Sequence, residues 1–193
     1  MTALRPAAFL DRDGVLNERP AVHDYVRTAG QFRWLPGAAE AVAALQAAGL
    51  VPIVVSNQRG IARGLVSWAT LRAVEETIQA ELDRHGARVE GFYYCPHEAE
   101  DGCDCRKPAP GLLHAAAAER GLDLEASVLV GDSESDVVAG LRAGCFTVRL
   151  APGPEGTAAG ASANDLSAAV RKVILPWLVR RSQNAASPRA PET

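Results

Sequence analysis

Two aspartates stand two residues apart at the end of an apolar run in the stretch FLDRDGVLN, residues 9–17. Asp11 and Asp13 are like charges, and neighbouring carboxylates raise one another's pKa unless a cation lies between them. Mg²⁺ is the natural candidate, because it prefers oxygen ligands. Alone, a D-x-D pair is more often an exposed turn or a helix cap than a catalytic pair.

Polar residues also follow other apolar runs of the chain. Ser56 and Asn57 follow VPIVV, Asp132 follows SVLV, and Arg106 and Lys107 come after GFYY and a cysteine-rich stretch. Each group alone could be a turn former, a surface charge or a residue that favours a helix N-terminus. Their joint order of carboxylate pair, hydroxyl, cation and carboxylate favours one shared site.

The apolar runs alternate with segments rich in Ala, Leu, Glu and Arg, and a glycine stands where most of these segments should end. We expect strands at residues 7–10, 51–55, 91–94, 127–130 and 146–150. We expect helices at residues 37–50, 68–86, 110–121 and 134–144. Continuous rather than alternating hydrophobicity in the strands predicts a doubly wound α/β fold with a parallel sheet covered on both faces. Ligands of such sheets bind at the carboxyl ends of the strands, where the polar residues are expected.

Length and composition indicate one domain. The 193 residues are 48% hydrophobic, enough for one sizeable core, which we place in residues 1–182. The net charge of −3 and the dispersed basic residues argue against nucleic-acid binding. The N-terminus lacks the pattern of a signal peptide, and no uncharged apolar run reaches about 18 residues, so we expect a cytoplasmic, monomeric protein without membrane contact. Residues 151–164 are predicted to be a flexible connection, 165–182 an amphipathic helix interrupted near Pro176, and 183–193 a disordered tail.

A second chemical signal lies in residues 95–105, CPHEAEDGCDC, where Cys95, His97, Cys103 and Cys105 are spaced as C-x-H-x5-C-x-C. Three thiolates and one imidazole form a closed tetrahedral set, as a structural zinc site requires. The alternatives are a disulfide, core cysteines or a redox role, and the acidic and glycine neighbours argue against a core. Cys145, the fourth cysteine, is expected to be a small core residue.

With these motifs in order, the sequence resembles the phosphatases of the haloacid-dehalogenase superfamily. The resemblance runs from about residue 9 to residue 150. The matching residues are Asp11, Asp13 and Gly14 in DRDGV, Ser56 in VVSN, Lys107 in CRKP, and Asp132 and Asp136 in GDSESD.

The resemblance implies a role for each matching residue. Asp11 would be the nucleophile that forms an aspartyl-phosphate, and Asp13 the general acid and base. Ser56 and Lys107 would stabilise the transferring phosphoryl group. Mg²⁺ would be held by Asp11, the backbone carbonyl of Asp13, and Asp132. Asp136 is expected to support Lys107 or Asp132 rather than to bind the metal.

The substrate is expected to be a phosphorylated sugar. The connections at residues 17–36 and 95–105 leave no room for a folded cap, and a capless plan with a zinc loop resembles heptose bisphosphate phosphatases and histidinol-phosphate phosphatases. SNQRGIARG at residues 56–64 and HDYV at residues 23–26 are more similar to the heptose group. That group would remove the C7 phosphate of D-glycero-D-manno-heptose 1,7-bisphosphate. Arg59 and Arg106, with Asn57, could bind the substrate, the arginines gripping its second phosphate.

Two alternatives remain open from the sequence. Histidinol phosphate carries a cationic amine, which the acidic residues Glu98, Glu100 and Asp101 of the zinc loop could contact. A noncatalytic, zinc-stabilised binding domain is the alternative of a different class, because a fold does not guarantee an activity.

Overall fold

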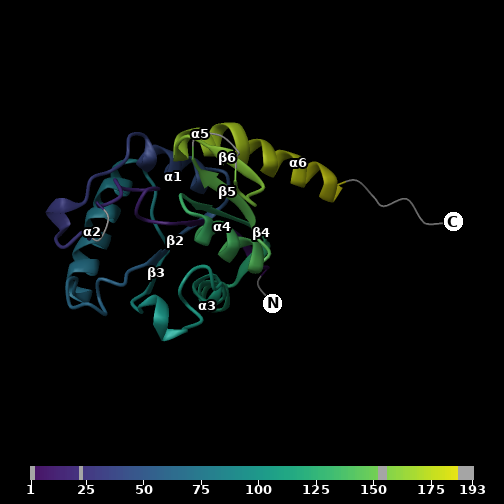
Figure 1. Cartoon of the computed structure of the whole chain (residues 1–193). Helices are drawn as coiled ribbons and strands as arrows, with labels where there is room; N and C mark the ends of the chain where they lie inside the picture. The colour runs from purple at the N-terminus through teal and green to yellow at the C-terminus, as the bar shows by residue number, and fades with distance from the viewer. Residues whose placement is uncertain (1–2, 22–23, 152–155, 187–193) are drawn as a thin grey trace.

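The computed structural model describes residues 3–21, 24–151 and 156–186. Its centre is a six-stranded parallel sheet with the strand order β3-β2-β1-β4-β5-β6 (Figure 1). The strands are β1 Arg5–Leu10, β2 Val51–Asn57, β3 Gly91–Cys95, β4 Leu122–Gly131, β5 Phe146–Leu150 and β6 Ala161–Ala163. The sheet confirms the doubly wound α/β fold, and β1, which the paired aspartates directly follow, lies near its middle.

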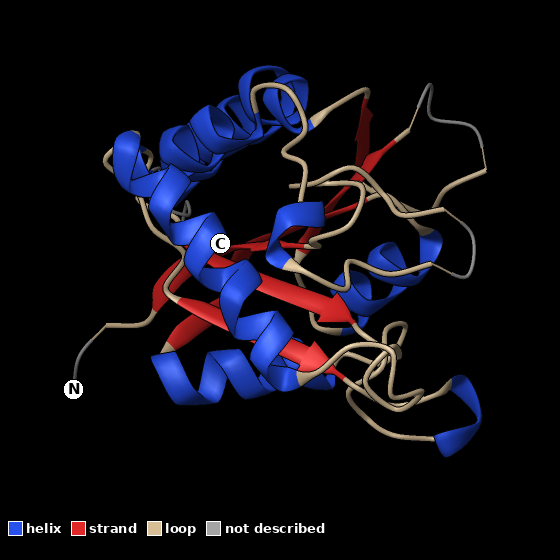
Figure 2. Ribbon diagram, turned by 90° about the vertical axis from the view of Figure 1, so that its left-hand side faces the viewer, coloured by secondary structure: helices blue, strands red, loops and turns tan. Residues whose placement is uncertain are grey.

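Helices cover both faces of the sheet (Figure 2). The α-helices are α1 Ala38–Ala47, α2 Trp68–Arg84, α3 Gly111–Arg120, α4 Glu134–Arg142, α5 Leu166–Ala169 and α6 Leu175–Ala186. Short 3₁₀ turns lie at Ala29–Gln31 and Ala99–Asp101, and a π-helical segment lies at Val170–Ile174. The first four α-helices begin and end within a few residues of their expected bounds.

Strands β1 to β4 contribute side chains to two separate apolar layers. In β1, Leu10 belongs to the layer under α1 and α2, where it joins residues such as Ile78. Its neighbour Phe9 points to the opposite face and joins Leu113 of α3. All four of these side chains are fully or almost fully buried. This two-sided burial explains why the strands are continuously hydrophobic in sequence.

Three parts of the fold differ from the sequence expectation. β4 begins at Leu122 because an early segment pairs with Arg5 and Pro6 before a bulge, and the expected strand then pairs with the rest of β1. β6 lies in the expected flexible connection, where Ala161 pairs with Val148 at the sheet edge. Small residues such as Ala161–Ala163 give little strand signal, so only the tertiary pairing reveals it.

The C-terminal helical region is also more continuous than expected. The interruption near Pro176 is a π-helical segment at Val170–Ile174, which accommodates a residue that has no backbone N–H to donate. α6 then continues to Ala186, past the boundary of the tail expected from residue 183. The rest of that expected tail, like residues 152–155, lies outside the described residues. In the part of the chain that the structure describes, no helix is long and apolar enough to cross a membrane.

Candidate active site

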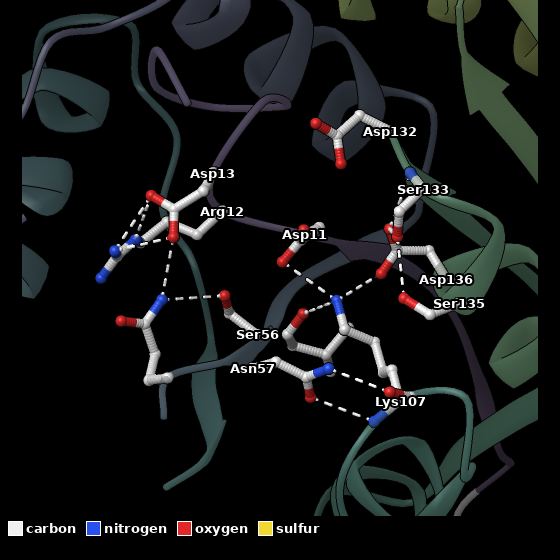
Figure 3. Close-up of polar contacts among 12 residues, drawn as sticks. Asp11, Arg12, Asp13, Ser56, Asn57, Lys107, Asp132, Ser133, Ser135 and Asp136 are labelled. Carbon is white, nitrogen blue, oxygen red and sulfur yellow. Dashed lines mark hydrogen bonds and ion pairs between the residues drawn. The ribbon is translucent and has the colours of Figure 1, made fainter. Parts of the chain in front are cut away.

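The sequence-predicted polar residues meet at the carboxyl end of the central strands (Figure 3). Asp11 follows β1, Asp132 follows β4, and Ser56 lies near the end of β2. A cleft of about 320 Å³ opens here. Seven predicted site residues line it: Asp11, Asp13, Ser56, Asn57, Arg59, Arg106 and Lys107.

Lys107 is a buried lysine with a fixed position. Its Nζ donates to the backbone oxygen of Val55 at 2.8 Å and lies 3.0 Å from Asp11 Oδ1 and 2.5 Å from Asp136 Oδ1. Burial alone would lower the pKa of this ammonium, but the two carboxylates outweigh it and raise the pKa above its ordinary value. Lys107 therefore stays cationic beside Asp11, and Asp136 forms the second ion pair with it.

Asp11 and Asp132 form the core of a candidate metal site. Together with Asp136 they present carboxylate oxygens that all lie within 4.8 Å of one another. Burial, with repulsion from other carboxylates, raises the pKa of Asp11, and the same causes raise that of Asp132 to about 6. No described residue donates a hydrogen bond of good geometry to Asp11 Oδ1, although Lys107 is close. A crowded, under-satisfied carboxylate pair of this kind fits a hard divalent cation such as Mg²⁺.

Gly14 and Arg19 shape the surroundings of Asp132. Gly14 has a φ of +88°, and a Cβ built on it would lie 1.9 Å from Asp132 Oδ2. Only glycine therefore fits there. Arg19, which the sequence analysis did not select, forms an ion pair with Asp132 from the loop after β1. Its signal was weak, because one basic residue in a surface loop carries no spacing pattern.

Asp13 is surrounded by donors, three of which the sequence analysis also missed. Arg12 and Asn17 lie in the same loop, and Gln58 follows β2; all three side chains hydrogen-bond to the Asp13 carboxylate. They are almost completely buried. Only their place in the sequence could have indicated them, because each lies within four residues of a motif residue. The Asp13 carboxylate is not grouped with the carboxylates of the metal site.

The expected substrate-binding residues are tied to neighbouring loops. The Asn57 side chain donates to the backbone oxygen of Lys107 and accepts from its N–H, both at 3.0 Å. Arg59 donates to the Tyr25 hydroxyl at 3.1 Å. Arg106 donates to the backbone oxygen of His97, also at 3.1 Å. Both arginines line the cleft together with Tyr25. Of the HDYV stretch, His23 lies outside the described residues.

The structure brings the four expected zinc ligands together. The Cys95 Sγ lies 3.6 Å from both His97 Nδ1 and Cys103 Sγ, and the Cys105 Sγ lies 3.2 Å from His97 Nδ1 and 3.5 Å from Cys103 Sγ. Ligands bound tetrahedrally at about 2.0–2.3 Å from zinc would lie roughly 3.5–3.8 Å apart. The geometry therefore fits a zinc ion, and all four thiols of the chain are free, including Cys145.

Hydrogen bonds and burial separate the thiols by acidity. Although burial opposes it, hydrogen bonds from Cys105, Cys95 and the backbone lower the pKa of the Cys103 thiol to about 7. Burial raises the pKa of Cys145 to about 12. Burial and neighbouring thiols raise the pKa of Cys105, inside the cluster, to about 12 as well, so Cys103 is the cluster thiol most ready to bind metal as a thiolate. Cys145 is identified as a core residue by its burial.

This site combines an aspartate pair after the central strand β1, a serine near the end of β2, a buried lysine and a further aspartate after β4. On a parallel sheet of this order, such a set defines a phosphatase of the HAD-like class. The HAD-hydrolase-like family model matches residues 104–173. The chain belongs to the HAD-like phosphatases, because curated heptose bisphosphate 7-phosphatases are more than 40% identical to it over most of their length. It is an enzyme, and HAD phosphatases use Mg²⁺ to hydrolyse phosphoesters.

Two curated relatives and one solved structure show the similarity. The D-glycero-beta-D-manno-heptose-1,7-bisphosphate 7-phosphatase of Rhodopseudomonas palustris is 42% identical over 147 residues, 72% of this chain and 80% of the relative. The corresponding alpha-heptose enzyme of Mycobacterium bovis is 41% identical over 165 residues, covering 82% and 86%. The D,D-heptose 1.7-bisphosphate phosphatase from B. bronchiseptica, complexed with magnesium and phosphate, has a TM-score of 0.77 and 33% identity, covering 89% of this chain and 99% of that one.

Proposed function

We propose that the protein removes the C7 phosphate of D-glycero-D-manno-heptose 1,7-bisphosphate through an aspartyl-phosphate intermediate. The observation that carries this proposal is the position of Asp11. Its carboxylate lies at the base of the cleft, 3.0 Å from the Lys107 ammonium and in one carboxylate cluster with Asp132. The names of the relatives supply the substrate, and Arg59 and Arg106, two of the arginines that line the cleft, supply charges that suit a second phosphate.

In the proposed reaction, Asp11 attacks the phosphorus and the bond to the sugar oxygen breaks. Asp13 gives a proton to that oxygen and then takes one from the water that hydrolyses the intermediate. Ser56 and Lys107 donate to the phosphoryl oxygens, whose charge is delocalised during transfer. Mg²⁺, held by Asp11, Asp132 and the backbone carbonyl of Asp13, would offset the repulsion between the carboxylate and the phosphate.

Zinc is proposed as a structural ion of the loop at residues 95–105. Its four ligands form a closed set and leave no position for substrate. Arg106 and Lys107 follow the last ligand, Cys105, directly in the sequence. The ion would therefore fix the start of the segment that places both cations in the cleft. A cytoplasmic location and a monomeric state remain part of this proposal.

The deciding experiment measures phosphate release with Mg²⁺ from both anomers of the heptose bisphosphate, from fructose 1,6-bisphosphate and from histidinol phosphate. Both anomers belong in the comparison because the relatives named for each are about equally similar to this chain. We expect kcat/KM to be highest for one heptose anomer and Asp11→Asn to abolish turnover. A preference for histidinol phosphate would overturn the substrate, and full activity of Asp11→Asn would overturn the mechanism.

A further inference from the structure

Arg12 is the largest fully buried side chain of the described residues, only 1% exposed. Its guanidinium meets one carboxylate, that of Asp13: Nη2 lies 3.0 Å from Oδ1 and 2.9 Å from Oδ2, and Nε lies 3.2 Å from Oδ1. Burying a guanidinium is unfavourable unless it is paired and hydrogen-bonded. The buried guanidinium strongly constrains Asp13, because its planar fork fixes the orientation of the carboxylate as well as its position.

Gln58, which directly follows β2, adds a second constraint. Its Nε2 donates to Asp13 Oδ2 at 2.9 Å and to Ser56 Oγ at 3.1 Å, while Asn17 Nδ2 reaches Asp13 Oδ1 at 2.9 Å. Gln58 is 2% exposed. Both oxygens of Asp13 are thus held by side chains from the loop after β1 and from the end of β2, and the carboxylate faces the cleft in one orientation.

We propose that Arg12 and Gln58 are positioning residues that hold the Asp13 carboxylate in line for proton transfer with the ester oxygen. The inference rests on the proposed function, in which Asp13 protonates the leaving group. Proton transfer to a leaving oxygen depends on hydrogen-bond reach and alignment, and it contributes typically about 10²–10⁴-fold to a rate. A freely rotating carboxylate would spend little time in that geometry.

Leaving-group dependence separates this role from structural support. Departure of a sugar alkoxide requires a proton, whereas p-nitrophenolate leaves readily without one. The test compares Arg12→Lys, which keeps the charge but loses the planar fork, and Gln58→Leu, which removes the amide. The rate of the first chemical step is measured in single turnovers, as alcohol released from heptose 1,7-bisphosphate and as p-nitrophenolate released from p-nitrophenyl phosphate.

We expect the ratio of the alkyl to the aryl rate to fall by about tenfold or more in both variants. Asp13→Asn removes the proton donor and therefore gives the largest expected fall in this ratio. Arg88→Met, at an exposed arginine, serves as the matched control. An unchanged ratio would overturn the inference. If both rates fell equally, the residues would support only the fold or Ser56, and if neither fell, they would have no role in the reaction. If Arg12→Lys does not fold, Gln58→Leu decides alone.

A failure of the proposed function would look different. In that case wild-type protein would not release alcohol from the heptose bisphosphate, or Asp13→Asn would leave the ratio of alkyl to aryl rates unchanged. The first result would remove the proposed substrate, and the second would remove Asp13 as the proton donor. A selective loss in Asp13→Asn that neither Arg12→Lys nor Gln58→Leu reproduces would leave the function standing and overturn only the positioning role.

Discussion

Gly14 lies so close to Asp132 that a single methyl group at residue 14 would overlap the carboxylate. A Cβ there would stand 1.9 Å from Asp132 Oδ2 and 2.6 Å from its Cγ. Real Cβ atoms do not approach other atoms so closely, so one of the two segments would have to move. The loop after β1 and the residue after β4 are therefore fitted to each other around the proposed metal site.

Gly14→Ala is expected to weaken Mg²⁺ binding by about tenfold or more, because Asp132 must turn away from the added methyl group. The substitution also forces alanine into a left-handed conformation, which costs roughly 1–2 kcal/mol. Gly49→Ala is the matched control, since Gly49 has nearly the same φ, +87°, with nothing within 4 Å of its Cβ position. Isothermal titration with Mg²⁺ would contradict the prediction if both variants bound equally well.

Lys107→Met should lower both activity and stability. The variant leaves Asp11 and Asp136 buried without their shared cation, and breaking a buried ion pair typically costs about 3–5 kcal/mol. We expect kcat to fall by at least about 100-fold. Urea unfolding and steady-state kinetics provide the measurements, with Lys172→Met, at an exposed lysine, as the control.

A double variant separates charge from packing at the same site. If the instability of Lys107→Met comes from uncompensated carboxylates, Lys107→Met combined with Asp136→Asn should be more stable than Lys107→Met alone. If the double variant loses as much free energy of unfolding as the two single variants lose together, the two residues contribute independently.

The position of the candidate site residues in the fold was predictable because their signal is local. Asp11, Ser56 and Asp132 each stand where an apolar run ends, and the carboxyl ends of parallel strands meet at one edge. The same logic placed the cysteine cluster, whose members lie close along the chain. Helices α1 to α4 were predictable for a similar reason, since composition and terminal glycines mark them.

The second layer of the site was not predictable in this way. Gln58 acts through a carboxylate that is 45 positions away in the sequence, and no spacing rule connects the two. Arg12 would be assigned to the surface by its residue type, yet it is buried. β6 was missed because an edge strand of alanine and serine is defined by its partner strand rather than by its own propensity.

Cys105→Ser is expected to abolish stoichiometric zinc binding and to lower Tm by about 5 °C or more, because the loop at residues 95–105 would lose one of four ligands. Activity should fall too, since Arg106 and Lys107 directly follow this ligand. Metal analysis by mass spectrometry gives the stoichiometry. Cys145→Ala, outside the cluster, should keep one zinc per chain. If removing zinc from the wild-type protein left its Tm unchanged, the proposed structural role of the ion would be wrong.

Glu75 on α2 predicts a dependence of stability on pH. Burial raises the pKa of this carboxyl in the folded protein, so the folded state holds its proton more tightly than the unfolded chain does. The corresponding stabilisation is complete below the unfolded pKa and is lost as the pH rises through the folded pKa. We expect Glu75→Gln to be a few degrees more stable than wild type at about pH 8 and to show no such advantage at about pH 4.

Thermal unfolding at a series of pH values measures this effect, and Glu76→Gln, at an exposed neighbouring position, is the control. The explanation fails if Glu75→Gln and Glu76→Gln shift Tm equally at every pH. It also fails if the advantage of Glu75→Gln grows as the pH falls, because that is the sign expected of a carboxyl with a lowered pKa.

The paired hydrogen bonds between the Asn57 side chain and the backbone of Lys107 limit how this enzyme can be recombined with its relatives. A carboxamide offers one donor and one acceptor at the required spacing, whereas aspartate at residue 57 offers acceptors alone. The lysine is thus located by a residue 50 positions earlier in the chain. A chimera whose first segment carries aspartate at residue 57 would keep Asp11 but lose the donor to the Lys107 backbone oxygen, and with it one of the two contacts that locate this lysine.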